Sequence, residues 1–435
     1  MVANNRLNSS SECLTELPDG QGFLLPLAVI YGKNGAGKSN LIKAINFGRE
    51  FITNESVKDD LVSVQGFALS EDSSAKPSVF TYRFLMEGSI YEYGFSILQG
   101  LIEEEWLYLL KGNREKTIFE RETSIEDGKT QVRVPKNKND VFNSKTVSFA
   151  NVFSKHNQLF LKSLVLNTSE KLGLCFEAYK WFDEELTTIF PESSFAELNN
   201  YILKNKEFKQ LSSKFISHAD TGITSLEVRH NKVALEQLPF SEDEMEKSIN
   251  LAKVDELTPF ATHDSGRRLL FKKLGDGNVD FYFEKITAQH KLGDKLLGDI
   301  ELGEESDGTQ RLLHLIPLLH RGDSESEIFV VDELDRSLHP LLLREFLNYF
   351  LSVCKANNSQ LIFSTHDSLL MDIEGLRRDE VWFVEKNKLG ETELYSLANF
   401  KLRKDVKLSK NYLSGRYGAI PFLGNIDTFI EAMEE

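Results

Sequence analysis

A run of eight residues near the N-terminus has the spacing of a phosphate-binding loop. Residues 32–39, Gly-Lys-Asn-Gly-Ala-Gly-Lys-Ser, match the pattern G-x-x-x-x-G-K-S/T at every position. Glycines let backbone N–H groups surround phosphate oxygens, and the start of a following helix adds a favourable dipole. We expect Lys38 to contact the β- and γ-phosphates of ATP, and Ser39 to bind Mg²⁺. The predicted nucleotide-binding residues of this loop are Gly32, Lys33, Asn34, Gly35, Ala36, Gly37, Lys38, Ser39 and Asn40.

Two carboxylates follow an apolar run at 327–333 (EIFVVDE). Such a run predicts a buried strand that ends in Asp332 and Glu333. In a phosphate-binding protein the first carboxylate holds Mg²⁺ through its water shell, and the second can orient and deprotonate an attacking water. The alternative is a strand end with two solvated acids.

Two more polar clusters stand where they could meet a γ-phosphate. Ser306 and Gly308 open an apolar helix expected at about 308–320, and a hydroxyl beside free N–H groups suits an anion. The alternative is an ordinary helix cap. Residues 360–367 (QLIFSTHD) predict another buried strand with polar residues at its end. His366 lies at that end and could bond a γ-phosphate oxygen, although a lone histidine is often structural.

Short buried strands and helices must position these groups. Residues 27–31 (LAVIY) predict a strand, and 38–51 a helix. Alternating aromatics at 78–121, with turn residues at 87–88, 99–100 and 111–113, predict an antiparallel meander. Residues 122–145 are expected to form a loop. Residues 148–255 are expected to be mostly helical, including 172–190 and 195–211, with a strand at 219–230.

The pattern predicts an α/β nucleotide-binding core interrupted by insertions. Residues 1–77 form its N-terminal part, 78–147 an antiparallel β lobe, 148–257 a helical insertion, 258–400 its C-terminal part, and 401–435 a tail.

Composition excludes several classes of protein. Lys and Arg number 51 and Asp and Glu 67, so the net charge of −16 disfavours non-specific coating of nucleic acid by the whole surface. The three cysteines are far apart, which argues against a disulfide scaffold or a cysteine zinc site. The sequence shows no signal peptide and no run of the roughly 18 apolar residues that span a bilayer, so we expect a cytoplasmic protein without a membrane partner.

The order of the four motifs resembles that of ABC-type ATPase heads, the group that includes SMC- and RecF-like proteins. The chain is more closely similar to stand-alone bacterial AAA-family ATPases linked to abortive-infection and restriction loci. These include the ATPase subunits of Rlo-like, Septu and phage anti-restriction-induced (PARIS) defence systems. The matching stretches are residues 25–45, 301–313, 328–346, 360–372, 377–386 and 413–423.

This resemblance implies a P-loop fold of ABC-ATPase type and a homodimer, or a higher oligomer, that holds ATP between subunits. Ser306 and Gly308 would contact the γ-phosphate of ATP bound by Lys38 of the partner subunit. The sequence differs from the usual Ser-Gly-Gly-Gln at Asp307 and Thr309, and His339 stands where SMC-like heads carry Asp. The glutamine of the Q-loop is not assigned. Relatives have a further strand or two before this point, so we also expect a longer native N-terminus.

The resulting hypothesis is an ATPase that senses infection and controls a separate effector, a nuclease or toxin. A second hypothesis is a DNA-repair or DNA-structure ATPase of SMC or RecF type. Nucleic acid is therefore an alternative partner. A third, the energising subunit of a membrane transporter, fits poorly with the altered Ser306 motif and the large insertion.

Overall fold

The computed structural model describes residues 1–3, 13–54, 62–70, 73, 75–112, 114–135, 155–167, 173–192, 202, 205–234, 254, 256–262, 268–292, 295–320, 327–403 and 406–421. The chain divides into two compact units. The first comprises Met1–Phe190, Gly322–Leu334 and Leu351–Glu435, and the second Pro191–Arg321 and Asp335–Phe350. The boundaries of these two units differ from those of the five segments predicted from the sequence. The five segments stay a prediction.

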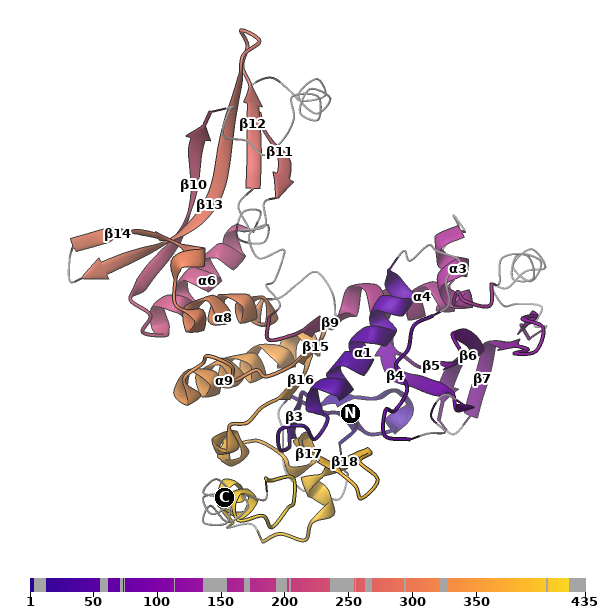
Figure 1. The fold of residues 1–435 in the computed structure, drawn as a ribbon. Coiled ribbons are helices and arrows are strands. Elements are labelled where there is room, and N and C mark those ends of the chain that lie inside the picture. Colours follow the sequence, from indigo (N-terminus) through magenta and orange to yellow (C-terminus); the bar gives the residue numbers. More distant parts are fainter. Residues whose placement is uncertain are drawn as a thin grey trace, which may run out of the picture. The chain divides into compact units, whose positions relative to one another are not determined.

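The first unit is built on a six-stranded sheet with the order β18-β17-β3-β16-β15-β9 (Figure 1). Its strands are β3 (Leu27–Tyr31), β9 (Leu186–Ile189), β15 (Ile328–Val331), β16 (Gln360–Ser364), β17 (Val381–Lys386) and β18 (Thr392–Ser396). All but β18 run parallel. β3 and β15 are buried at every residue, which is why they are continuously apolar. The strands predicted at 27–31, 327–333 and 360–367 are confirmed.

One strand of this sheet was predicted as helix. Residues 172–190 do begin as a helix, α4 (Leu174–Lys180), and continue as one π-helical turn, Trp181–Glu185. They then become β9, which pairs in parallel with β15. The expectation of helix at 186–189 is wrong because two threonines and an isoleucine suit a strand, and pairing with β15 outweighs local helix propensity.

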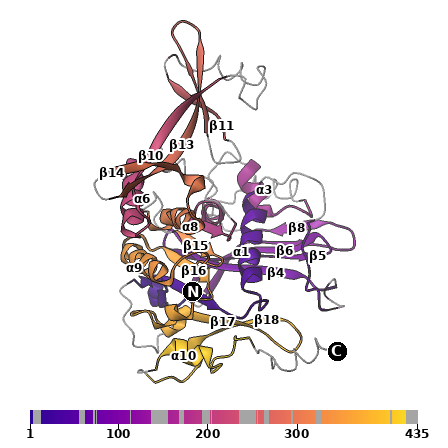
Figure 2. The ribbon, with the colours of Figure 1, turned by 60° about the vertical axis from the view of Figure 1, so that its left-hand side comes forward.

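Helix α1 (Lys38–Thr53) follows β3 as predicted and packs against the antiparallel meander, as Figures 1 and 2 show. Phe47 meets Phe80 with ring centroids 5.1 Å apart, and Phe51 meets Phe95 at 5.5 Å. The meander is a five-stranded sheet in chain order, β4 (Ser78–Met86), β5 (Ser89–Leu98), β6 (Leu101–Lys111), β7 (Arg114–Thr123) and β8 (Thr130–Arg133). The predicted meander and its turns are confirmed.

The prediction of a loop over residues 122–145 is wrong in part, because β7 continues to Thr123 and β8 forms a further strand at Thr130–Arg133. Residues 136–154 lie outside the described part of the chain.

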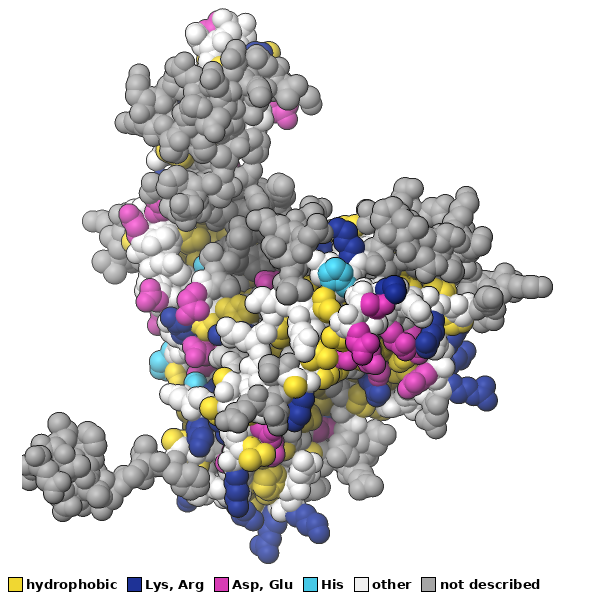
Figure 3. All heavy atoms as spheres, turned by 45° about the vertical axis from the view of Figure 1, so that its right-hand side comes forward, with side chains coloured by type: hydrophobic (Ala, Val, Ile, Leu, Met, Phe, Trp, Pro, Cys, Tyr) yellow, Lys and Arg dark blue, Asp and Glu magenta, His cyan; other side chains and the backbone are white. Residues whose placement is uncertain are grey.

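Opposite charges on neighbouring strands of the meander form exposed ion pairs, Arg83 with Glu92 and Arg133 with Glu122. In Figure 3 acidic and basic side chains are accordingly intermixed on the right of the molecule.

A buried carboxylate fastens the meander to helix α3 (Phe160–Asn167). Glu105 accepts hydrogen bonds from the N–H groups of Phe160 at 2.6 Å and Leu161 at 3.0 Å, and from the Tyr93 hydroxyl at 2.9 Å. Burial raises the pKa of Glu105, and the nearby guanidinium of Arg121 opposes that shift. The helix N-terminus thus receives the acceptor that its exposed N–H groups require.

The second unit contains α6 (Lys206–His218), α8 (Asp307–Leu315), the first part of α9 (Pro340–Asn357) and a five-stranded antiparallel sheet. The strands are β10 (Ile223–Val233), β11 (Leu257–Thr262), β12 (Arg268–Lys273), β13 (Val279–Leu292) and β14 (Lys295–Glu301). The strand expected at 219–230 is confirmed as β10. Most of 195–204, expected to be helical, lies outside the described residues.

The predicted fold class is confirmed. The chain is a mixed α/β protein with a P-loop between a parallel strand and a helix, and it carries an antiparallel β-meander. Among the described residues, no helix combines the length and the hydropathy needed to cross a membrane.

Candidate nucleotide-binding site

The P-loop connects the end of β3 to the start of α1. Gly35 and Gly37 have φ angles of 74° and 113°, a region that residues with a Cβ rarely adopt. A Cβ at Gly37 would lie 2.3 Å from the Thr392 hydroxyl, and one at Gly32 would lie 2.6 Å from the Val384 carbonyl oxygen. Three glycines are therefore required by backbone conformation or by close approach.

The side chains of the loop differ in exposure. Lys38 is 6% exposed, and its ammonium group donates a hydrogen bond to the Gly32 carbonyl at 2.8 Å. Ser39 is half-buried one residue later, while Asn34 and Asn40 are exposed. The N–H groups of the first helical turn have no partners within the helix, so they can meet an anion.

The C-terminal hairpin β17–β18 supports the loop. The hydroxyl of Thr392, at the start of β18, donates to the Ala36 carbonyl at 3.0 Å. The sequence analysis missed Thr392, because 356 residues separate it from Ala36. No pattern in the sequence indicates which strand would lie beside the loop.

The register of the parallel strands brings the predicted carboxylates to the same edge as the loop. Ser364 of β16 pairs with Ile30 of β3, two residues before Gly32. Phe363 pairs with Val331 of β15, so Asp332 is level with Ser364. The carboxyl ends of the three strands therefore hold the P-loop, Asp332 and the residues after Ser364 side by side.

Ser364 joins the two carboxylate residues. Its hydroxyl donates to Asp332 Oδ1 at 2.5 Å and accepts from the Glu333 N–H at 2.8 Å. Its carbonyl accepts from the Leu334 N–H at 3.0 Å. Ser364 is fully buried, and Asp332 is 3% exposed. The sequence analysis placed Ser364 in a strand and gave it no role, although a serine at the end of the neighbouring strand was the available signal.

Glu333 has a strained backbone. Its φ is 49°, in the left-handed region, which costs a residue with a side chain on the order of 1–3 kcal/mol. The side chain is half-buried. Such strain is common where a side chain must be aimed at a reacting group.

His366 lies at the same edge. The N–H of Thr365 bonds the Ile30 carbonyl at 3.1 Å, and the Asp367 N–H bonds the Thr365 hydroxyl at 3.0 Å. The Tyr31 hydroxyl donates to the Asp367 carbonyl at 3.2 Å. These contacts hold the backbone on both sides of His366, whose side chain is exposed.

Ser306 and Gly308 belong to the second unit. Ser306 caps α8, since its hydroxyl accepts from the Thr309 N–H at 3.2 Å. This geometry is that of the ordinary cap considered as the alternative, and the γ-phosphate contact stays a prediction. A Cβ at Gly308 would lie 2.7 Å from the Ser337 carbonyl oxygen. His339 caps α9 by accepting from the Leu341 N–H at 3.2 Å.

The donors at the sheet edge fit Mg²⁺ and ATP. Ser39 and Asp332 offer the oxygen ligands that Mg²⁺ prefers. The loop supplies a cation, Lys38, and the N–H groups of a helix start, which together suit a polyphosphate. The arrangement can therefore hold a nucleotide phosphate chain with Glu333 and His366 at the same edge.

A profile of the family described as "AAA domain, putative AbiEii toxin, Type IV TA system" matches residues 27–372. A search of curated proteins gives no significant match. Among solved structures, an SMC head bound to the C-terminal winged-helix domain of ScpA is 15% identical, covering 86% of this chain and 91% of that one, with a TM-score of 0.41.

The SMC head domain from Thermotoga maritima is 17% identical over 88% of this chain and 96% of that one, with a TM-score of 0.34. We draw nothing further from structural similarity at this level. The family profile, in contrast, spans β3, the P-loop, Asp332 and His366, and it covers most of the chain. The protein therefore belongs to the AAA-domain family of that description.

Proposed function

We propose that this protein binds and hydrolyses ATP with Mg²⁺ in the cytoplasm and uses this cycle to control a separate effector protein in anti-phage defence. The observation that carries the proposal is the P-loop beside the pair Asp332–Glu333, held together by Ser364. The family description supports the context, since it names a putative toxin of a type IV TA system.

Each residue of the site has a role in this proposal. The loop 32–40 and Lys38 bind the phosphates, and Ser39 and Asp332 hold Mg²⁺, which neutralises phosphate charge when bound. Glu333 orients the attacking water and accepts its proton. His366 contacts a γ-phosphate oxygen. Each subunit of a dimer also lends Ser306 and Gly308 to the ATP of its neighbour.

Three substitutions test the chemistry. Lys38→Ala should abolish ATP binding, because the main phosphate contact is lost. Glu333→Gln should bind ATP but stop hydrolysis and trap the closed dimer. His366→Ala should slow turnover with less effect on binding. Nucleotide binding and phosphate release by the purified chain measure both steps. If Glu333→Gln hydrolyses ATP at the wild-type rate, Glu333 is not the group that accepts the proton of the attacking water.

Mixing two inactive variants tests the dimer. A dimer of one Lys38→Ala subunit and one Ser306→Arg subunit keeps one intact site, formed by Lys38 of the second and Ser306 of the first. The mixture should therefore hydrolyse ATP although neither variant does so alone. If the mixture stays inactive while both variants are folded, Ser306 does not act across a dimer.

The alternative function in DNA repair makes a different prediction. ATP hydrolysis would then be stimulated by DNA and would fall steeply with salt, because phosphate contacts release counterions. Co-purification with the products of adjacent genes, in the absence of DNA stimulation, supports the effector proposal instead.

A further inference from the structure

Two of the three cysteines meet at one carbonyl group of helix α9. Cys13 lies just before β1 (Thr15–Glu16), and Cys354 lies in the last part of α9. Both are thiols, and each donates a hydrogen bond to the Leu351 carbonyl oxygen, Cys13 at 3.0 Å and Cys354 at 3.2 Å. Because both sulfurs lie so close to one atom, they can be no more than about 6 Å apart.

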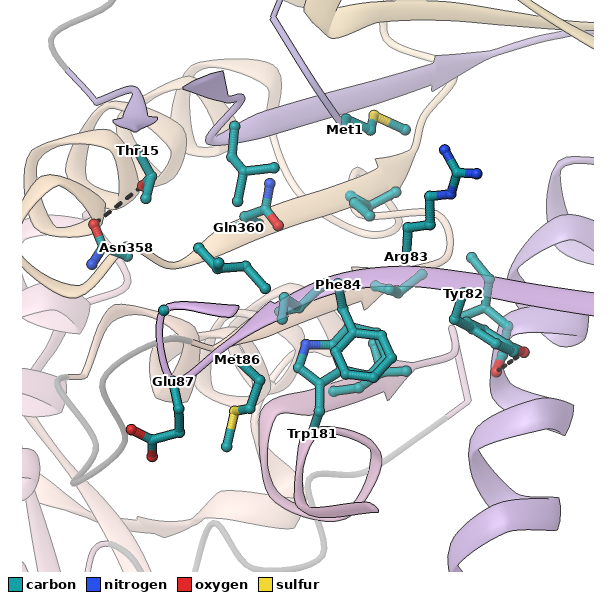
Figure 4. Close-up of a pocket in the computed structure, with 18 of the residues that line it drawn as sticks. Met1, Thr15, Tyr82, Arg83, Phe84, Met86, Glu87, Trp181, Asn358 and Gln360 are labelled. Atoms are coloured by element: carbon teal, nitrogen blue, oxygen red, sulfur yellow. Dashed lines mark hydrogen bonds between the residues drawn. The ribbon is translucent and has the colours of Figure 1, made fainter. Parts of the chain in front are cut away.

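A second contact holds the same segment against the end of α9. The Thr15 hydroxyl donates to Asn358 Oδ1 at 3.1 Å, and Asn358 directly follows the helix (Figure 4). β1 also pairs with β2 (Phe23–Leu24), which leads into β3. All of these residues belong to the first unit. The position of Cys13 beside α9 therefore rests on two hydrogen bonds and a strand pair.

The separation of the two sulfurs is within reach of a disulfide. The bond joins sulfurs about 2 Å apart. A cysteine sulfur moves by roughly 3 Å when its side chain changes from one staggered rotamer to the next. Rotation of the two side chains is therefore large enough to close a gap of at most about 6 Å.

The two thiols differ in their exposure to solvent. Cys13 is half-buried, so a small oxidant can reach its sulfur, whereas Cys354 is only 3% exposed. Redox-sensing cysteines are commonly accessible and lie next to a second cysteine that resolves the first oxidation product. Cys13 is therefore the thiol that an oxidant meets first. Cys175, the third cysteine, is fully buried in α4 and serves as an internal reference.

We propose that Cys13 and Cys354 are a redox-sensitive pair that hydrogen peroxide converts into a reversible disulfide. The Cys13 thiolate attacks one peroxide oxygen, the O–O bond breaks, and the products are Cys13 sulfenic acid and, after proton transfer, water. The Cys354 sulfur then attacks the sulfenic sulfur, the S–O bond breaks, and the oxygen leaves as a second water. Two thiols and one peroxide thus give one disulfide and two waters, and two electrons pass from sulfur to oxygen. A small thiol such as dithiothreitol restores both cysteines by exchange.

The bond would tie the segment before β2 to the last part of α9. The chain between the two cysteines forms a long loop, and closing a long loop lowers the entropy of the unfolded chain. The oxidised protein should therefore unfold at a higher denaturant concentration than the reduced protein. Disulfides in reducing compartments are usually transient and redox-sensing, which fits a pair that starts as thiols. This inference stands without the proposed ATPase function.

Trypsin separates the three cysteines, which lie in the peptides 7–33, 172–180 and 345–355. The experiment treats the purified full chain with hydrogen peroxide after removal of reductant, blocks the remaining thiols with N-ethylmaleimide in denaturant, and maps the peptides by mass spectrometry. We expect peptide 7–33 joined to peptide 345–355, lighter by two hydrogen atoms than the two together, and peptide 172–180 carrying maleimide. Dithiothreitol should abolish the joined peptide. The urea midpoint of unfolding should rise on oxidation and return with dithiothreitol.

Three variants separate the roles of the cysteines. Cys354→Ser removes the resolving thiol, so peroxide should leave a Cys13 sulfenic acid that dimedone traps on peptide 7–33. Cys13→Ser should leave Cys354 as a thiol, because the Cys354 side chain is buried. In both variants the urea midpoint should not respond to peroxide. Cys175→Ala is the matched control and should form the bridge as the wild type does.

Four outcomes overturn the proposal. The first is that Cys13 and Cys354 both still react with maleimide after peroxide treatment. The second is oxidation of Cys13 to sulfinic acid in the wild type without a bridge. The third is a bridge to peptide 172–180 instead. The fourth is a joined peptide found only in chains that migrate as dimers on a non-reducing gel, which would make the bond a link between two copies.

Discussion

Replacing Ser364 by alanine removes two hydrogen bonds from the centre of the proposed catalytic site. One is a buried bond to the carboxylate of Asp332 at 2.5 Å, a type that contributes about 1.5–3 kcal/mol to stability. The other satisfies the Glu333 N–H at 2.8 Å, and a neutral bond of this kind contributes about 1 kcal/mol. We therefore expect Ser364→Ala to lower the free energy of unfolding by about 2.5–4 kcal/mol.

The same substitution should slow ATP hydrolysis by about 10- to 100-fold, the usual cost of losing a group that orients a ligand or a catalytic side chain. Ser409→Ala is a matched control, since the Ser409 hydroxyl donates to a carboxylate, that of Asp372, away from the site. Denaturant unfolding and phosphate release measure both effects. If Ser364→Ala and Ser409→Ala lose equal stability and both keep the wild-type hydrolysis rate, Ser364 has no role in orienting Asp332 and Glu333.

Three other predictions follow from single contacts. Thr392→Val should weaken ATP binding by up to about tenfold in a titration, because it removes the bond to Ala36, whereas Thr392→Ser should not. Glu333→Gly should raise the free energy of unfolding by about 1 kcal/mol, because glycine accepts a φ of 49°, yet hydrolysis should stop; an unchanged stability would show that the backbone relaxes without cost. Burial raises the pKa of Glu380 from 4.5 to about 7. The folded state therefore keeps the proton of this carboxyl group at a pH where the unfolded state has lost it. As a result, the free energy of unfolding falls as the pH rises from about 4.5 to about 7. Glu380→Gln keeps an acceptor for the Arg377 N–H and should therefore raise the free energy of unfolding by up to about 3 kcal/mol at pH 8 and by little at pH 4.

The elements with strong local signals were predictable from the sequence. The P-loop is specified by its glycines, and the buried strands β3, β15 and β16 by their continuous apolar runs. The meander is specified by alternating aromatics and by glycine at its turns. In each case the residues that determine the structure lie within about ten positions of one another, so their pattern is visible without the fold.

The contacts that hold the site together were not predictable, because the two partners of each contact are distant in the chain. Thr392 contacts Ala36 across 356 positions, and Ser364 contacts Asp332 across 32. Strand β9 was mistaken for helix for a related reason. Its place at the edge of the parallel sheet depends on pairing with β15, more than 130 residues later, and short segments have little propensity of their own to oppose such pairing.

The backbone conformation of Glu333 shows how a contact with a residue distant in the chain, Ser364, determines local structure. After Val331 the chain leaves β15, and the Asp332 N–H bonds to the Ile189 carbonyl. The next two N–H groups, those of Glu333 and Leu334, both bond to Ser364, one to its hydroxyl and one to its carbonyl. Two successive N–H groups can point at one residue only if the backbone turns between them, and the positive φ of Glu333 provides that turn. The order Asp-Glu in the sequence thus supplies the carboxylates, but the end of the neighbouring strand decides where the second one points. A chain that kept Asp332 and Glu333 and lost Ser364 would retain the motif without its geometry.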